Sequence, residues 1–361
     1  MRQWTELEPH DSQQPPSRQT ASRRPDGSTV PGMAPTPRIG RRAFLGGTIG
    51  VLAAAGLSAC TGTSSQSTAT TSSAETSTSA AAEAVTVPSI DELVAAVTSS
   101  FTQASYTDIE TGIVLPYNVF LPHDYDTGTR YPLVHYIADS SLVGQDVTAP
   151  LSQYGALIWA SEAEQAKHPS IVVVPEYPEV ILDDHDSFTT TDYVELTARF
   201  VNFLRAEYSV DTNRVYGTGQ SMGCMTTMYL TAKYPDLFAA EMLVSGQWDI
   251  TSLQNLADAT FVYTAAGGDA NATDGQTEVE NMLSTAGVPF QTATWDATWE
   301  PTKLDSSAQE LLSAGDSANF ATFATGTVLT ANPVSNMEHM ASFEPGYKIT
   351  ALRDWLFEQQ A

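Results

Sequence analysis

The feature that most constrains the fold lies in the middle of the chain, where an apolar run over residues 213–217 leads into Gly219-Gln-Ser-Met-Gly223 and a helical pattern follows. This is a G-x-S-x-G pattern set between a predicted strand and a predicted helix. Glycine two positions before and after Ser221 lets the chain turn tightly against its neighbours. Such a turn holds the hydroxyl at the end of a sheet, next to a helix N-terminus. The segment therefore predicts a sheet whose strands feed directly into helices.

The chain from residue 89 onward alternates between strand-like and helical patterns. Strands are predicted at residues 113–121, 131–137, 171–175, 213–217, 241–245, 260–265 and 289–294. Helices are predicted from residue 89, over 152–165, over 192–208, after 221, over 275–286 and over 347–359. Strands that alternate with helices indicate a mainly parallel sheet flanked by helices on both faces. We therefore expect one α/β catalytic domain over residues 89–361.

The charge is unevenly distributed. The net charge is −26, yet seven of the 16 basic residues lie in the first 42 positions, which leaves 9 basic against 38 acidic residues from position 60 onward. So acidic a folded part argues against binding of nucleic acid and favours uncharged substrates over anionic ones. The two cysteines cannot build a disulfide framework.

Residues 1–59 are predicted to be an export signal. Arg41-Arg42 is followed by Phe-Leu and an uncharged run, which resembles a twin-arginine signal. The run ends in Leu57-Ser-Ala-Cys60, which resembles a bacterial lipobox with a lipidated cysteine. We expect an exported protein that contacts the outer face of the bacterial cytoplasmic membrane through a lipid on Cys60, or that is secreted. A plain secretory signal and a retained membrane helix are the alternatives.

Residues 60–88 are dominated by Ser, Thr and Ala, with almost no large apolar side chain. Such a segment cannot bury enough surface to offset the entropy of ordering it, so it is predicted to be a tether. Residues 1–32 are long for the basic region of a signal, so Met33 is expected as an alternative to Met1 as the start of the chain.

A serine hydroxyl needs a base before it can attack a carbonyl carbon. In α/β-hydrolases the chain order is Ser, acid, His, and only His339 of the six histidines follows Ser221. The acid that orients the base is predicted to be Asp269, because Gly-Gly-Asp269 follows an apolar strand, with Asp274 as the alternative. The backbone N–H of Met222 and that of Ser140 are predicted to stabilise an oxyanion, with Asp139 as the alternative to Ser140.

Three further predictions concern the surroundings of this site. Trp248 follows a strand at the edge where ligands bind in open α/β sheets, so it is predicted to contact substrate. His185 lies in an acidic run, Asp183 to Asp186, which we interpret as a solvated loop, so neither a metal nor a cofactor is expected. Residues 298–330 resemble an insertion that overhangs the cleft.

Several stretches together resemble the secreted α/β-hydrolase esterases, a group that includes polyhydroxybutyrate depolymerases and feruloyl esterases and is related to prolyl-oligopeptidase-type serine hydrolases. The stretches are residues 117–122, Tyr131-Pro-Leu-Val, residues 211–223 and Arg353-Asp-Trp-Leu-Phe357. The resemblance runs from about residue 106 to 358 and implies the same Ser221, Asp269 and His339. Relatives often carry His-Gly where this chain has Ala138-Asp139, so the oxyanion loop departs from the pattern.

These observations predict a serine esterase that hydrolyses a small or polymeric carboxylic ester through an acyl-serine intermediate. A serine acyltransferase or prolyl-oligopeptidase-type peptidase is one alternative, and a non-catalytic surface-binding lipoprotein is another. The natural ester and the oligomeric state stay open.

Overall fold

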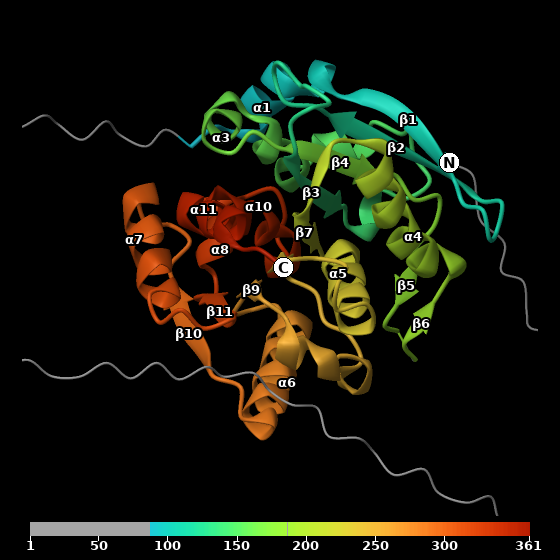
Figure 1. Ribbon diagram of the computed structural model, residues 1–361. Coiled ribbons are helices and arrows are strands. Elements are labelled where there is room, and N and C mark those ends of the chain that lie inside the picture. The colour runs from blue at the N-terminus through green and yellow to red at the C-terminus, as the bar shows by residue number, and fades with distance from the viewer. Residues whose placement is uncertain (1–86, 186) are drawn as a thin grey trace, which may run out of the picture. The chain divides into compact units, whose positions relative to one another are not determined.

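The computed structural model describes residues 87–185 and 187–361 (Figure 1). The chain divides into two units, Met1–Thr78 and Ser79–Ala361, and every described residue belongs to the second. The predicted export signal, the predicted lipid on Cys60 and all but the last two residues of the predicted tether lie outside the described residues. Among the helices that are described, none combines the length and the apolar character needed to cross a bilayer.

The described chain is built on a nine-stranded sheet with the order β1-β2-β4-β3-β7-β8-β9-β11-β10. The pairs β1–β2 and β2–β4 are antiparallel, and the other pairs of this sheet are parallel. The strands are β1 Thr102–Thr107, β2 Val114–Phe120, β3 Tyr131–Ile137, β4 Ile171–Pro175, β7 Val210–Gln220, β8 Ala240–Val244, β9 Phe261–Ala266, β10 Phe290–Trp295 and β11 Ala318–Phe323. A separate antiparallel hairpin pairs β5 Leu182–Asp183 with β6 Thr189–Thr190.

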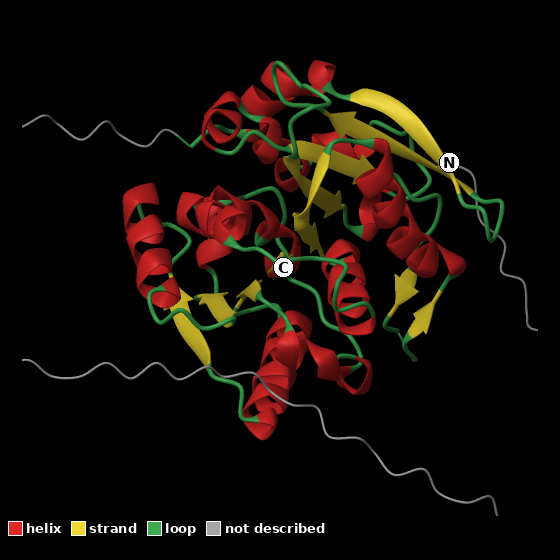
Figure 2. Ribbon diagram, viewed as in Figure 1, coloured by secondary structure: helices red, strands yellow, loops and turns green. Residues whose placement is uncertain are grey.

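Helices cover both faces of the sheet (Figure 2). The core on one face includes side chains of α4 Asp192–Glu207, α5 Met222–Lys233 and α6 Ala270–Ala286. The core on the other face includes side chains of α1 Ile90–Val97, α2 Tyr154–Leu157, α7 Pro301–Leu312, α10 Phe343–Lys348 and α11 Thr350–Glu358. The central strands β4, β8 and β9 are buried along their whole length, as apolar strands covered on both faces must be. The predicted α/β fold is confirmed.

Two segments that were each predicted to be one helix are divided into shorter helices, so these two predictions are wrong. The helix expected over 152–165 is a series of short pieces, because Ser161 has extended backbone and its hydroxyl accepts the N–H of Glu164, which starts a new helix, α3 Glu162–Lys167. The helix expected over 347–359 is interrupted at Ile349, whose extended backbone separates α10 from α11.

The prediction of an overhanging insertion at residues 298–330 is wrong. This stretch forms α7 and β11, and β11 lies between β9 and β10 in the main sheet. Phe320 and Phe323 of β11 are buried, at 1% and 0% exposure. The stretch is therefore part of the core, and none of its residues lines the cavity next to Ser221.

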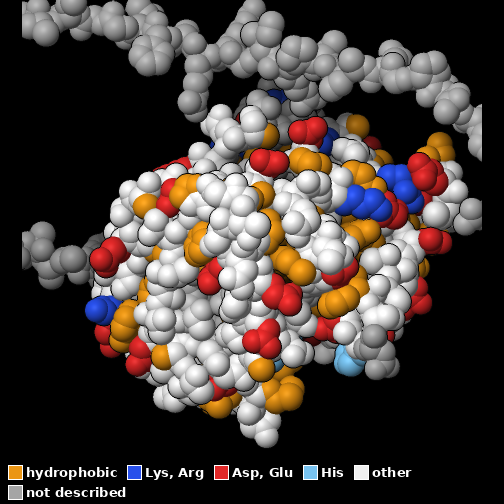
Figure 3. All heavy atoms as spheres, turned by 90° about the horizontal axis from the view of Figure 1, so that it is seen from below, with side chains coloured by type: hydrophobic (Ala, Val, Ile, Leu, Met, Phe, Trp, Pro, Cys, Tyr) orange, Lys and Arg blue, Asp and Glu red, His pale blue; other side chains and the backbone are white. Residues whose placement is uncertain are grey.

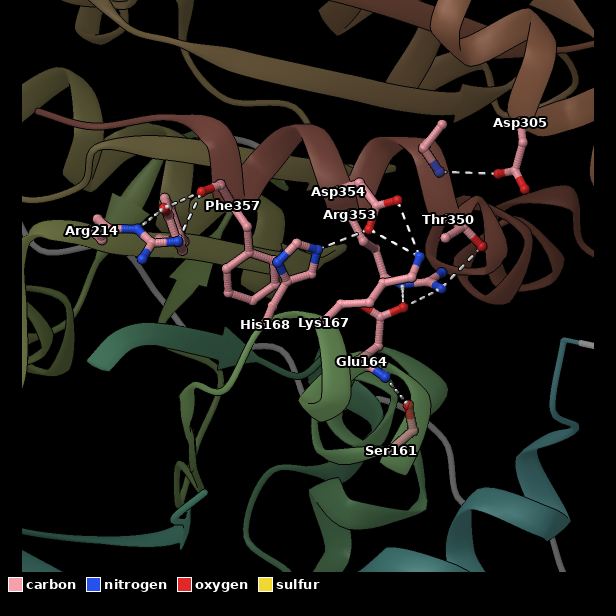
Figure 4. Close-up of polar contacts among 12 residues, drawn as sticks. Ser161, Glu164, Lys167, His168, Arg214, Asp305, Thr350, Arg353, Asp354 and Phe357 are labelled. Atoms are coloured by element: carbon pink, nitrogen blue, oxygen red, sulfur yellow. Dashed lines mark hydrogen bonds and ion pairs between the residues drawn. The ribbon is translucent and has the colours of Figure 1, made fainter. Parts of the chain in front are cut away.

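A buried ion pair ties the C-terminal helix to the rest of the domain (Figure 4). Arg353 of α11 donates from Nε and Nη2 to one oxygen of Glu164 in α3, at 2.9 and 2.7 Å. Next to this pair, Asp354 accepts from Lys167 and contacts His168 Nε2 at 2.9 Å. The carboxylates of Glu164 and Asp354 come close enough to His168 to share a cation, but Arg353 and Lys167 already neutralise them. The cluster therefore joins α3 to α11 through ion pairs.

Candidate active site

Ser221 occupies a sharp turn between β7 and α5. Its φ is 51°, in the left-handed region that non-glycine residues rarely adopt, so the turn stores strain. A Cβ at Gly223 would come within 2.0 Å of the carbonyl oxygen of Ile137, and one at Gly219 within 2.5 Å of the backbone of Gly223. The two glycines are therefore required by close approach of backbone to backbone, as the sequence pattern predicts.

The structure brings together the three side chains expected from chain order. His339 Nε2 lies 2.9 Å from Ser221 Oγ, and His339 Nδ1 lies 2.7 Å from Asp269 Oδ2. Asp269 follows β9 and is the N-cap of α6, and His339 lies in the short helix α9 Glu338–Ala341. Asp274 lies further along α6 and is exposed. The geometry therefore favours Asp269 over Asp274 as the partner of the imidazole.

A chain of hydroxyls holds the backbone at His339. Ser342 Oγ donates to the carbonyl oxygen of His339 at 2.7 Å, and its oxygen lies 2.6 Å from Ser245 Oγ. Because the single proton of Ser342 is used on His339, Ser245 must be the donor to Ser342. Ser245 follows β8 and has a positive φ of 48°, so a second strained residue contributes to this edge of the sheet. The sequence carries no signal for this pair, because the two serines that contact each other are 97 positions apart in the chain.

Ser221 opens into a cavity of about 480 Å³. Ser140 and Met222, the predicted oxyanion donors, both line it. Trp248, the predicted substrate contact, does not: it is 3% exposed, and its ring is covered by the exposed Phe188 and the half-buried Tyr229. The remaining lining residues are Val180, Leu182, Asp183, Asp184, His185, Ser221, Met225, Gly246, Gln247, Asp269, Asn271 and His339.

The loop after β3 is held by the side chain of Asp139, a residue for which the sequence predicted only a backbone role. The buried carboxylate of Asp139 accepts the N–H of Ser141 at 2.8 Å and the amide of Gln220 at 2.9 Å, and it also accepts from Gln153. The Ser140 backbone is therefore fixed next to the end of β7. No local pattern reveals this role, because Gln153 and Gln220 lie 14 and 81 positions further along the chain.

One wall of the cavity is acidic. Asp183, Asp184 and His185 of the β5–β6 hairpin line it, and the imidazole of His185 lies 2.7 Å from Asp183. Hydrogen bonds from the backbone and side chain of His185 hold the pKa of Asp183 below its usual value. The three groups are close enough to share a cation, but the hairpin is largely exposed, so a solvated, metal-free loop stays our prediction. On the face shown in Figure 3, acidic side chains are scattered widely and basic ones are few.

Cys224, one turn along α5 from Ser221, offers no competing nucleophile. Its side chain is fully buried, and burial raises the pKa of the thiol. A thiol kept protonated and away from solvent does not attack an acyl group.

Comparisons with known proteins bear on the fold and the family of this chain. A solved structure, "Crystal Structure of a Thermostable Esterase", superposes with a TM-score of 0.60 and 22% identity, covering 73% of this chain and 64% of that one. The acetylxylan esterase A of Aspergillus ficuum is 45% identical over 49 residues, which are 14% of this chain and 16% of that protein. A probable acetylxylan esterase A of Aspergillus clavatus is 32% identical over 103 residues, 26% of this chain and 32% of that protein.

The matches thus span less than a third of these curated relatives, and the structural likeness supports the α/β-hydrolase fold. The family follows from a match to a protein-family model. The model of the Esterase family, described as "Putative esterase", matches residues 110–319, more than half of the chain. The predicted resemblance to α/β-hydrolase esterases is confirmed: this chain belongs to the Esterase family.

Proposed function

We propose that this chain is a serine hydrolase that cleaves carboxylic esters with Ser221, His339 and Asp269 as its triad. The observation that carries the proposal is the placement of one imidazole between the Ser221 hydroxyl, at 2.9 Å, and the Asp269 carboxylate, at 2.7 Å. This is the arrangement in which a histidine takes the serine proton while a carboxylate fixes its tautomer.

The reaction proceeds in two halves. Ser221 Oγ bonds to the ester carbonyl carbon as its proton moves to His339 Nε2, and the carbonyl oxygen becomes an oxyanion. The backbone N–H groups of Met222 and Ser140 stabilise that charge. The C–O bond to the alcohol then breaks, and the alcohol leaves with the proton from His339. A water molecule, deprotonated by His339, then attacks the acyl carbon; the bond to Ser221 Oγ breaks, Oγ takes the proton back from His339, and the carboxylic acid is released.

The substrate is proposed to be a neutral ester, with acetylated carbohydrates as the first candidates. The acidic wall formed by Asp183 and Asp184 repels carboxylate or phosphate groups. The carboxylates, together with the amides of Gln247 and Asn271 in the same cavity, can hydrogen-bond to hydroxyl groups. Curated relatives named acetylxylan esterases support this choice.

The test of the proposed function is Ser221→Ala in the purified protein. We expect kcat on a short p-nitrophenyl ester to fall by at least about four orders of magnitude, because no other nucleophile is available to the imidazole. Ser313→Ala, at an exposed serine at the end of α7, is the control and should keep full activity. Retained turnover in Ser221→Ala would refute the proposal. Offering acetylated sugars, alcohol acceptors and proline-containing peptides to the wild type separates hydrolysis from acyl transfer and peptide cleavage.

We also propose that the chain is exported and carries lipid on Cys60. The support is the sequence alone: paired arginines, a short uncharged run and small residues before the cysteine. Expression of the full chain in a bacterium with lipoprotein processing should place it in the membrane fraction, and Cys60→Ser should release it. An unchanged distribution of the variant would refute the lipid anchor.

A further inference from the structure

The residue before the proposed catalytic base makes two contacts that the mechanism does not use. Glu338 is the first residue of α9, and its carboxylate accepts two backbone N–H groups. Gly268 donates to Oε2 at 2.9 Å, and Gly326 donates to Oε1 at 2.8 Å. Each oxygen therefore has its own donor, from a different loop.

The two donors belong to loops that follow neighbouring strands. Gly268 lies between the end of β9 and Asp269, and Gly326 follows β11, which pairs with β9 in parallel register up to Phe323. One carboxylate thus connects the helix that bears His339 with the loop that bears the acid and with the next loop along the sheet. Hydrogen bonds from backbone N–H to a carboxylate are charge-assisted and stronger than neutral ones.

The sequence around Gly268 is adapted to this contact. A Cβ at Gly268 would lie 2.3 Å from Glu338 Oε1, and the three nearest atoms that it would meet all belong to the Glu338 carboxyl group. Gly268 has no positive φ, so its backbone conformation alone does not require glycine. The close approach of Glu338 is therefore the physical reason for glycine at this position.

We propose that Glu338 is a positioning residue that sets the separation of His339 and Asp269 by holding the base-bearing helix against the acid-bearing loop. This inference rests on the proposed function, because it assigns Glu338 to the geometry of the proposed triad. Glu338 itself does not line the cavity, so it acts through its neighbour. A neutral amide cannot replace it fully, because Gln has one acceptor oxygen where two N–H groups converge.

The first test separates kcat from KM. Glu338→Ala should lower kcat on the p-nitrophenyl ester about 10- to 100-fold with KM unchanged, since a small displacement of a catalytic group costs rate and not ground-state binding. Glu338→Gln keeps one acceptor and should lose roughly threefold to tenfold. Glu344→Gln is the matched control, because Glu344 is also half-buried but pairs with Lys348 in α10. A kcat within twofold of wild type in Glu338→Ala, or a higher KM at constant kcat, would overturn the proposal.

The second test is a double-mutant cycle with Gly268→Ala. In the wild-type background this substitution forces the carboxylate away and should lower kcat about tenfold, whereas in Glu338→Ala it should cost less than twofold, because residues in contact are not additive. Equal effects in both backgrounds would show that the contact does not set the rate. Thermal unfolding of each variant checks that the fold is intact, and Glu338→Gln carries the test if Glu338→Ala does not fold.

A third measurement does not depend on turnover, so it distinguishes failure of this inference from failure of the proposed function. The proton on His339 Nδ1 gives a far-downfield NMR resonance when a carboxylate accepts it, and Asp269→Asn identifies the signal by removing it. We expect the signal to be lost or broadened in Glu338→Ala and kept in Glu344→Gln. An unchanged signal in Glu338→Ala would refute the positioning role, even if the wild type hydrolysed no ester.

Discussion

Replacing Asp269 with asparagine tests the triad most sharply, because the structure determines which way the new amide must face. Asp269 Oδ1 accepts the N–H of Ala272 at the start of α6, and Oδ2 faces His339 Nδ1. The carbonyl oxygen of an asparagine would keep the first contact, so its NH₂ group would point at Nδ1. The imidazole would then carry its proton on Nε2 and could not accept the proton of Ser221.

The expected loss follows from that change of tautomer. A triad whose histidine is held in the wrong tautomer loses about 10⁴-fold in kcat, or about 5 kcal/mol of transition-state stabilisation. The side chain of Asp269 is only 7% exposed, so water cannot easily take over the role of the carboxylate.

The assay is steady-state hydrolysis of a p-nitrophenyl ester at neutral pH, with protein folding checked by thermal unfolding. Asp274→Asn is the matched control, since Asp274 lies on the same helix, is exposed and was the alternative acid. We expect it to retain full activity. A loss below tenfold in Asp269→Asn, or an equal loss in both variants, would refute the assignment of the acid.

Three further predictions concern stability. Burial raises the pKa of Glu241 to about 8, above its unfolded value of 4.5. The contribution of Glu241 to the free energy of unfolding is therefore fully present below pH 4.5. It is lost as the pH rises toward 8, by up to about 1.4 kcal/mol per pH unit. Glu241→Gln should remove that slope in urea unfolding, and a persisting slope would refute its origin in Glu241. Arg353→Met leaves the buried carboxylate of Glu164 without its cation and should lower the free energy of unfolding in urea by about 3 to 5 kcal/mol. Lys167→Met removes a more exposed ion pair and should lower it by less than about 1 kcal/mol. Equal losses in the two variants would refute the argument. Gly223→Ala should fail to reach the soluble folded state, because its Cβ would meet a carbonyl oxygen at 2.0 Å, and a normal melting temperature would contradict this.

Much of the architecture was predictable because buried parallel strands and amphipathic helices leave strong local patterns. The strands at 131–137 and 171–175 have the predicted bounds, since their runs of apolar residues end at polar turns. β1 was missed, because it is an edge strand whose sequence, Thr-Gln-Ala-Ser-Tyr-Thr, is mostly polar and mostly exposed. β11 was missed for a different reason: its two phenylalanines are interspersed with small and polar residues, so the run is neither continuously apolar nor regularly alternating, although only Thr322 is not fully buried.

The residues of the candidate site also fall into two groups, those with a signal in the sequence and those without one. Ser221 was predicted from a local turn motif, and Asp269 and His339 from chain order and from the strand end before Asp269, which can all be read from one sequence. Trp248 follows its strand as predicted, but its ring does not face the cavity. Where the ring points depends on contacts with Phe188 and Tyr229, which the sequence does not reveal. Glu338 and Asp139 act through contacts with distant loops, which no pattern in one sequence reveals.

The position of β11 has a consequence for the order in which the molecule can become active. β10 pairs with β11 and with no other described strand, so it has no partner in the sheet until the chain has passed residue 323. Until then β9, the strand that leads to Asp269, is the open edge of a growing sheet. His339 and Ser342, whose hydroxyl binds the His339 carbonyl, arrive later still, so a ribosome-bound chain has its nucleophile and acid before it has a base. Export of a finished enzyme and not of an unfolded chain would then spare β9 from strand-to-strand association during transit.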